Sequence, residues 1–140
     1  MMKKALLCAE VEMEVPFQDV DVMQVVWHGN YFRYFEAARS QLLRRIDYDY
    51  AEMRASNYLW PIIETRVRFV QAVHYRQQIV VSAMLMEWEN RLRIDYRIRD
   101  AHTGARLTTC YTIQCAVDAQ THALQLVSPP PLLERLKAYL

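Results

Sequence analysis

The sequence predicts an α+β fold in which an antiparallel sheet of five to six strands wraps around one long central helix. Apolar residues recur at helical spacing over residues 30–46, and segments with strand-like apolar patterns lie before and after them. A single apolar helix beside a larger sheet can bury its stripe only by lying against that sheet. With 140 residues, 53% of them hydrophobic, the chain can bury a core, and we expect a single domain over residues 1–140.

The strands are predicted from the spacing of their apolar side chains. Residues 10–15 alternate strictly until Pro16, which is expected to end the strand. Residues 79–88 are almost continuously apolar, as in a strand covered on both faces, and this suggests that a second chain contributes to burial. Residues 47–60 look like a short irregular or helical link. The expected strands cover residues 10–15, 62–70, 79–88, 92–99, 106–117 and 123–127.

The long helix is predicted from a change of period after residue 29, and Asn30 is a suitable residue to cap it. A small terminal helix is expected over residues 132–140, with Leu133, Leu136 and Leu140 at roughly helical spacing. The apolar stripe of the long helix is expected to consist of Tyr31, Tyr34, Phe35, Ala38, Leu42 and Ile46.

Composition argues against several classes of protein. The chain has 17 basic and 16 acidic residues, and this balance argues against a nucleic-acid binder, which usually carries a basic face. It has two glycines and neither of the glycine-rich phosphate-binding motifs. The three cysteines lack C-x-x-C spacing and the four histidines lack H-x-x-x-H spacing, so we expect neither a disulfide framework nor a metal site, and no cofactor.

The chain is expected to be cytoplasmic and to have no membrane partner. Its first apolar run ends at Ala9, short of the ~7–15 residues that a signal peptide needs. No stretch approaches the ~20 apolar residues of a membrane-spanning helix.

The most informative segment runs from residue 19 to residue 39. Asp19 and Asp21 stand one residue apart and are followed by an apolar patch, by the tripeptide at 28–30 and by the start of the helix. Unpaired backbone N–H groups collect where a helix begins, so an acid beside them could open an ester or a thioester. Taken alone, however, acids in a loop more often cap a turn or face solvent.

The order D-x-D-x-x-x-x-V-x-H-x-N-Y-x-x-x-x-E-x-x-R over this segment resembles that of the hotdog-fold acyl-CoA thioesterases, in the 4-hydroxybenzoyl-CoA thioesterase branch. The resemblance extends to the order of elements over essentially the whole chain. It implies hydrolysis of an acyl-CoA or acyl carrier protein thioester to a free acid and a thiol. It also implies a homodimer or homotetramer in which two chains build each site.

By this resemblance the second acid, Asp21, is the catalytic carboxylate, and His28 lies in the site. Asp21 could attack the thioester directly or activate water. His28 could donate to the substrate carbonyl or position a water, or it could be a loop histidine that backbone groups satisfy. Asp19 is expected to order the loop.

The expected substrate-binding residues follow Asp21 along the chain. Backbone amides near Gly29, Asn30 and Tyr31 could hold the negative charge that develops on the carbonyl oxygen, although Asn30 and Tyr31 also fit helix entry and packing. Trp27 could line the acyl channel or simply pack. Glu36 could line the site, or it could form an ordinary surface ion pair with Arg39.

Two departures from the family pattern bear on function. Relatives usually carry a glycine three residues after the catalytic acid, where this chain has Gln24, so the backbone there should be less permissive. Many relatives also carry a tyrosine four residues before that acid, where this chain has Phe17. These departures keep open a non-catalytic acyl-thioester-binding module. A hotdog hydratase or dehydratase is the other alternative, but its D-x-N-P-x-H signature is missing from the sequence.

Overall fold

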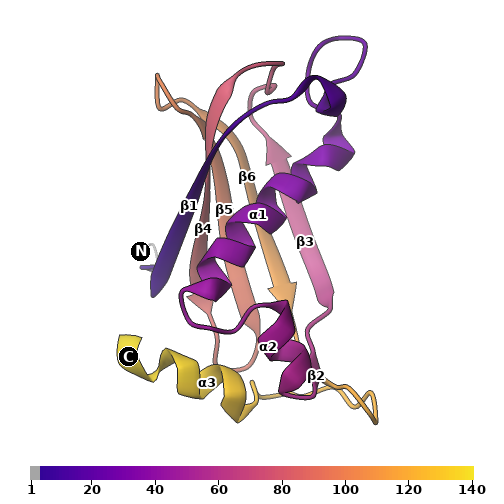
Figure 1. Cartoon of the computed structure of the whole chain (residues 1–140), viewed down its shortest axis with the longest axis vertical. Helices are drawn as coiled ribbons and strands as arrows, with labels where there is room; N and C mark the ends of the chain where they lie inside the picture. Colours follow the sequence, from indigo (N-terminus) through magenta and orange to yellow (C-terminus); the bar gives the residue numbers. More distant parts are fainter. Residues whose placement is uncertain (1–3) are drawn as a thin grey trace.

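The computed structural model describes residues 4–140 and confirms the predicted arrangement of an antiparallel sheet with one long helix against it. Five strands pair in the order β1-β4-β5-β6-β3, and α1 crosses one face of the sheet diagonally (Figure 1). The sheet strands are β1 (Leu7–Glu14), β3 (Ile62–Phe69), β4 (Gln78–Glu87), β5 (Leu92–Asp100) and β6 (Arg106–Gln114). The remaining elements are α1 (Tyr31–Arg44), α2 (Tyr50–Ala55), β2 (Tyr58–Leu59), β7 (Val117–Asp118) and α3 (Pro130–Leu136).

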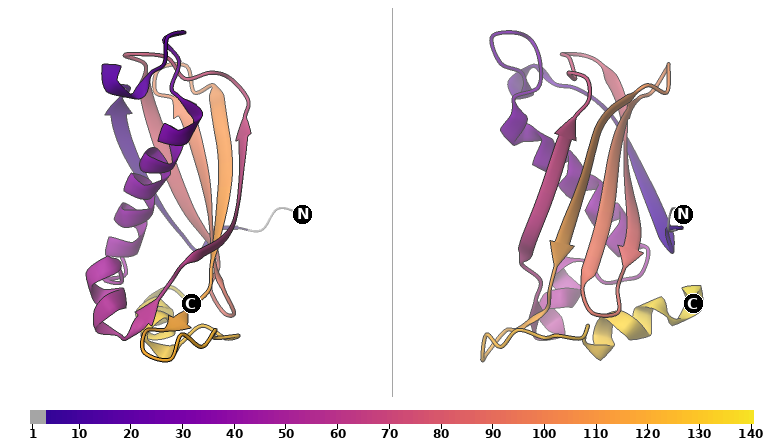
Figure 2. Two further views of the ribbon diagram at one scale, coloured as in Figure 1. Left: turned by 90° about the vertical axis from the view of Figure 1, so that its right-hand side faces the viewer. Right: turned by 180° about the vertical axis from the view of Figure 1, so that it is seen from behind.

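The core lies between α1 and the sheet. Every residue of the predicted helical stripe is buried, and Phe35 places its ring 5.1 Å from that of Tyr96 on β5. Ala38 is fully buried, and its small side chain lets the helix approach the sheet closely. Figure 2 shows α1 and α2 on the same side of the sheet. Within residues 4–140, no helix has the length and apolar character needed to cross a membrane.

Strand β4 is buried on both faces within the single chain, as predicted for a strand covered on both sides. Val80 and Ser82 point away from α1 and are 3% and 8% exposed within the single chain. Long charged side chains from the neighbouring strands cover this face: Ser82 donates to Glu10 at 2.9 Å, and Arg99 donates to the same carboxylate at 2.8 Å. The Arg99 guanidinium also lowers the pKa of Glu10. Charged side chains bury apolar surface under their stems, so the burial of this strand does not by itself indicate a second chain, and the contribution of more than one chain to burial stays a prediction.

The end of the sheet differs from the prediction. The expected strand over residues 106–117 ends at Gln114, and Val117–Asp118 pairs instead with β2. The expected strand at 123–127 is absent from the described structure, where Leu124 makes only an isolated bridge to Val117. The Asp118 carboxylate accepts backbone N–H groups at residues 120 and 121 and so closes a turn before any longer pairing can form.

The terminal helix begins earlier than expected, at Pro130, because proline lacks the N–H group that the first helical turn leaves unpaired. Its buried residues are Leu132 and Leu136 rather than the predicted set, and Leu140 is exposed. The helix is short, and a 3-10 turn at Lys137–Tyr139 follows it. The apolar spacing therefore located the helix but misplaced its start and its buried side.

Candidate functional site

The acid pair lies in a tight loop between β1 and α1. An isolated bridge joins Val20 to Val26, and the backbone of Asp21 accepts from Gln24 and donates to Val25, each at 2.9 Å. A second bridge, from Val25 to His74, ties the loop to the segment before β4. The loop is therefore held by backbone pairing on both sides.

Asp19 anchors this loop to the start of α1. It is 3% exposed, and its two carboxylate oxygens have different partners: Oδ1 forms an ion pair with Arg33, and Oδ2 accepts the Tyr34 hydroxyl at 2.7 Å. Its backbone carbonyl accepts the Trp27 N–H at 3.0 Å. Burial, with the Asp19 carboxylate beside it, raises the pKa of Tyr34, so this hydroxyl stays a donor. The expectation that Asp19 orders the loop agrees with these contacts.

Asp21 has a different environment, although it lies only two residues further on. It is half-buried, and its Oδ1 accepts the Met23 N–H at 2.8 Å. Among residues 4–140, its Oδ2 has no hydrogen-bond donor. Of the two acids, Asp21 is the one that keeps a carboxylate oxygen available for chemistry.

A 3-10 turn at His28–Asn30 leads into α1 and modifies the predicted helix entrance. The Asn30 N–H donates to the Trp27 carbonyl at 2.8 Å, so this amide is already used. The Asn30 side chain makes no capping bond and instead donates to the Asp19 carbonyl at 2.9 Å. Asn30 thus stands at the N-cap position of α1, as predicted, but without the side-chain bond of a capping residue. The Gly29 N–H is without a hydrogen-bond partner in the described part of the chain, so this amide is a free donor at the helix entrance.

Gly29 has a side chain packed directly against it. A Cβ atom built on Gly29 would overlap the ring of Trp27, whose residue is 51% exposed. His28 is also exposed, and its ring lies 4.8 Å from the Trp27 ring. The His28 ring makes no hydrogen bond to the residues that the structure describes, so backbone groups do not satisfy it. Tyr31 is buried, with its ring 4.9 Å from Phe69, and serves packing.

Replacing Gly29 with alanine will displace the Trp27 indole. Because this ring is half-exposed and can swing outward, we expect a loss of only about 1 kcal/mol in the free energy of unfolding, at the low end for overpacking. Urea denaturation measures the loss, and a red shift of tryptophan emission reports the released ring. In a Trp27→Ala background, which lacks the ring, Gly29→Ala should cost almost no stability. An equal loss in both backgrounds would contradict the overlap.

Gln24 holds the backbone conformation that favours glycine, with φ 62°. Gln24 therefore keeps the left-handed backbone conformation that a glycine would adopt here, and it does so with steric strain. Gln24→Gly should raise the free energy of unfolding by roughly 0.5–1 kcal/mol, because glycine adopts positive φ without steric cost. Thermal unfolding measures this gain. Gln24→Ala is the control, since it removes the side chain and keeps the strain. Stabilisation by alanine as large as that by glycine would contradict the backbone explanation.

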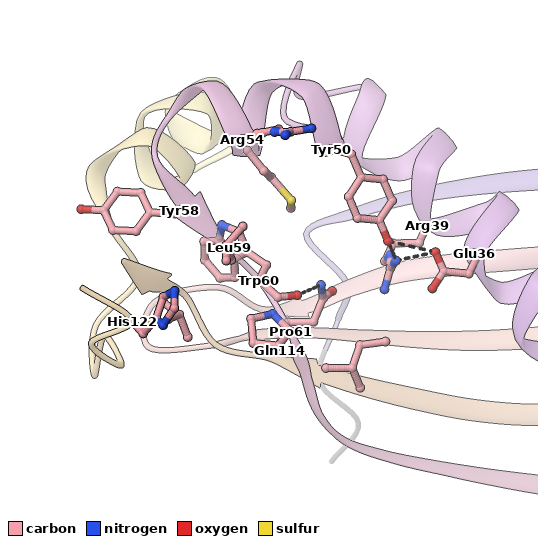
Figure 3. Close-up of a pocket in the computed structure, with 13 residues that line it drawn as sticks. Glu36, Arg39, Tyr50, Arg54, Tyr58, Leu59, Trp60, Pro61, Gln114 and His122 are labelled. Carbon is pink, nitrogen blue, oxygen red and sulfur yellow. Dashed lines mark hydrogen bonds and ion pairs between the residues drawn. The ribbon is translucent and has the colours of Figure 1, made fainter. Parts of the chain in front are cut away.

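A cavity of about 900 Å³ opens further along α1, between this helix, α2 and the start of β3 (Figure 3). Glu36 is the only predicted site residue among those that line it, and Asp21, Trp27, His28 and Gly29 do not. Sequence reasoning missed the contribution of the link at 47–60 and of the end of β6. The polar or aromatic residues of its wall that matter below are Glu36, Arg39, Tyr50, Arg54, Trp60, Gln114 and His122.

Glu36, Arg39 and Tyr50 form a connected group on the cavity wall (Figure 3). The Arg39 Nη2 donates to the Glu36 carboxylate and to the Tyr50 hydroxyl, and that hydroxyl donates to Glu36 at 3.0 Å. Arg39 is 2% exposed, so the alternative of an ordinary surface ion pair is wrong for this residue. Burial raises the pKa of Tyr50.

One stripe of the helix connects the two groups of candidate residues. Gly29, Phe32, Glu36 and Arg39 follow one another at spacings of three, four and three residues, which places them along one side of the helix and its entry turn. This side lies next to the stripe that packs on the sheet. Gly29 and the cavity residues Glu36 and Arg39 therefore lie on the same side of α1 and its entry turn.

Comparison with known proteins gives a consistent result. A family model described as the thioesterase-like superfamily matches residues 15–138. A curated protein of Synechocystis sp., named "Putative esterase sll0410", is 27% identical over 128 residues, which cover 91% of this chain and 77% of that protein. The solved DHNA-CoA thioesterase of Staphylococcus aureus is 24% identical, with a TM-score of 0.76 over 84% of this chain and 78% of that one. The S. aureus protein SAV2348, solved in complex with CoA, is 13% identical, with a TM-score of 0.82 over 99% of this chain and 85% of that one.

Proposed function

Because the chain belongs to the thioesterase-like superfamily, we propose that it hydrolyses an acyl-CoA to a free carboxylic acid and CoA. The single observation that carries the assignment of Asp21 is the contrast between the two acids. Both carboxylate oxygens of Asp19 are bonded within the protein, whereas Asp21 keeps one oxygen without a donor among the described residues. The reactive carboxylate is thus fixed by its loop and left free at one oxygen.

The chemistry needs an attacking oxygen and a place for the oxyanion. Asp21 either attacks the thioester carbon, forming a mixed anhydride that water then opens, or removes a proton from an attacking water. In both routes the C–S bond breaks and the thiol leaves as a thiolate, whose conjugate acid has a pKa of about 8.5 in a simple cysteine-like thiol, so little protonation is required. The Gly29 N–H is the proposed oxyanion donor, with a typical value of about 3–4 kcal/mol for one such donor.

The two routes differ in the fate of the water oxygen. In a single turnover with excess enzyme in ¹⁸O-labelled water, direct attack leaves label in the Asp21 side chain whenever water opens the anhydride at the aspartyl carbon. Activation of water sends all label to the released acid. Mass spectrometry of the peptide that contains residue 21 distinguishes them.

The proposed substrate position follows the α1 stripe. With the carbonyl at Gly29, the acyl group would pass Phe32 and end in the cavity beside Glu36. His28 and Trp27 are exposed at the entrance, where they can contact the thioester or the pantetheine. CoA as the carrier is supported by relatives whose names include CoA, and an acyl carrier protein thioester is the second candidate.

We also propose at least a homodimer, as the family resemblance implies, and a homotetramer is the other expected form. Strand β3 lies at the edge of the sheet and pairs only with β6 in the described chain. Its apolar residues Ile63 and Phe69 are 57% and 51% exposed, which is unusual for an edge strand that faces solvent. Sedimentation equilibrium measures the assembly. Membership of the 4-hydroxybenzoyl-CoA branch and a cytoplasmic location remain predictions.

A panel of acyl-CoAs tests the function. Purified protein is incubated with each substrate, and thiol release is followed with a chromogenic disulfide. Release of thiol that increases linearly with protein concentration supports the proposal. Binding without release would identify the non-catalytic acyl-thioester-binding module, and hydration of an enoyl-CoA without thiol release would identify a hydratase. Either of these results would overturn the hydrolase assignment.

A further inference from the structure

The cavity wall contains a buried cation with unused hydrogen-bond donors. We propose that this cavity binds a carboxylate at the far end of the acyl group, so that the substrates are monothioesters of dicarboxylic acids. This inference rests on the proposed thioesterase function. It adds the chemical class of the acyl group, which that function leaves open.

Arg39 is the residue that carries the proposal. Its side chain is 3% exposed, and both of its hydrogen bonds, to Glu36 and to Tyr50, come from Nη2. The donors on Nε and Nη1 have no acceptor among residues 4–140, although Arg39 lines the cavity. Neither nitrogen is among the enclosed polar atoms that lack a partner, so both can reach the cavity, where a ligand can accept from them. A carboxylate suits the guanidinium best, because the planar fork of arginine matches two carboxylate oxygens.

The charges around the cavity favour the same ligand. Arg39 and Arg54 are cations on its wall, His122 is a third basic group, and Glu36 is the single acid. Glu36 already engages Nη2 of Arg39 and is partly open to solvent, with its side chain 43% exposed. An additional anion can therefore enter without leaving the wall negatively charged overall.

Gln114 could favour a different ligand group, a hydroxyl, so the strengths of the two possible hydrogen bonds must be compared. Its Nε2 donates to the Trp60 carbonyl at 2.7 Å, and its Oε1 is buried without a donor in the described chain. An acceptor of this kind would favour a ligand hydroxyl. However, Oε1 is enclosed by protein, and hydrogen bonds to an ionised group are roughly twice as strong as neutral ones. Arg39 therefore sets the preference, and a carboxylate is favoured over a hydroxyl.

The position of Arg39 defines a ligand of moderate length. It lies eight residues beyond Tyr31, or about 12 Å along the helix axis at ~1.5 Å per residue. The guanidinium lies nearer the entrance than this, because Arg39 donates to Glu36 about one turn closer to it, so the acyl group must span only roughly 7–8 Å to place a second carboxylate there. Matched pairs of different length are therefore part of the test.

The experiment compares kcat/KM for diacid and monoacid thioesters of equal length on the full chain: adipoyl-CoA against hexanoyl-CoA, and suberoyl-CoA against octanoyl-CoA. Wild type should prefer one or both diacid members by roughly 10- to 100-fold, as expected for charge-assisted hydrogen bonds. Arg39→Met should remove this preference, because it lowers kcat/KM for the diacid thioesters by a larger factor than for the monoacid thioesters. Arg44→Met is the matched control, because this arginine of the same helix lies outside the cavity with its side chain 64% exposed.

Glu36→Gln should change the diacid preference in the opposite direction to Arg39→Met, and so it separates the proposed role from a folding defect. Removing the acid that competes for Arg39 should increase the diacid preference several-fold, which a misfolded variant cannot do. Equal or faster hydrolysis of the monoacids by wild type, or an equal loss of both rates in Arg39→Met, would overturn the inference. Absence of hydrolysis across all four substrates would overturn the proposed function instead. In that case calorimetric binding decides the inference: adipoyl-CoA should bind more tightly than hexanoyl-CoA, and Arg39→Met should abolish the difference.

Discussion

Replacing Asp21 with asparagine will lower kcat for acyl-CoA hydrolysis by about 10³-fold, because an amide can neither attack a thioester nor accept a proton from water. The substitution keeps the shape of the side chain, and its Oδ1 can still accept the Met23 N–H at 2.8 Å. We therefore expect the free energy of unfolding to change by less than about 0.5 kcal/mol, as for most substitutions near the surface. Thiol release under saturating substrate and urea denaturation of the same sample measure the two effects.

Asp19→Asn is the matched control for this prediction. It makes the same chemical change two residues away, at a carboxylate whose oxygens are bonded to Arg33 and Tyr34. Its main effect should fall on stability, and its kcat should exceed that of Asp21→Asn by at least ten-fold. If Asp21→Asn kept wild-type kcat, or if Asp19→Asn proved the more damaging to kcat in a folded protein, the catalytic role would belong elsewhere.

Truncating Asp19 to alanine will cost about 2 kcal/mol of stability, the largest effect we expect from a single side chain of this loop. The Tyr34 hydroxyl is buried and would lose its acceptor at 2.7 Å, which costs ~1–3 kcal/mol. The ion pair with Arg33 adds little to this figure, because the Arg33 side chain is 56% exposed and water can replace the carboxylate. Chemical denaturation monitored by circular dichroism measures the loss.

A double-mutant cycle with Tyr34→Phe separates this contact from a general disturbance of the loop. If the hydroxyl–carboxylate bond dominates, Asp19→Ala should cost clearly less in the Tyr34→Phe background than in wild type. Strict additivity would show that the two groups do not interact energetically and would contradict the anchoring role of Asp19.

The superfamily match confirms the prediction of a hotdog-fold enzyme of the thioesterase type. The long helix was predictable because its apolar stripe is continuous over four turns, and each member of that stripe is buried. The expected strand at 123–127 failed because apolar alternation does not reveal whether a neighbouring strand is present to pair with. Asn30 stands at the N-cap as predicted, but a 3-10 turn precedes the helix and the Asn30 side chain donates to the Asp19 carbonyl instead of capping.

The candidate site was partly accessible from the sequence. The loop acids and the helix entrance are close in the chain, so local pattern could place them together. The cavity could not be found in this way, because its wall joins α1 to Tyr50, Trp60 and Gln114 across long sequence separations. The burial of Arg39 was also hidden, since a charged residue on a helix is exposed in most proteins.

The separation of Asp21 from the cavity has a consequence for how the protein can diversify. Bond cleavage is assigned to residues 19–31, whereas the far wall of the cavity comes from α2, β2 and the strand ends that follow. Substitutions around residues 50–62 can therefore reshape what is accepted while the reacting atoms keep their geometry. A library confined to that segment should yield variants with altered acyl preference and undiminished turnover on their new substrates.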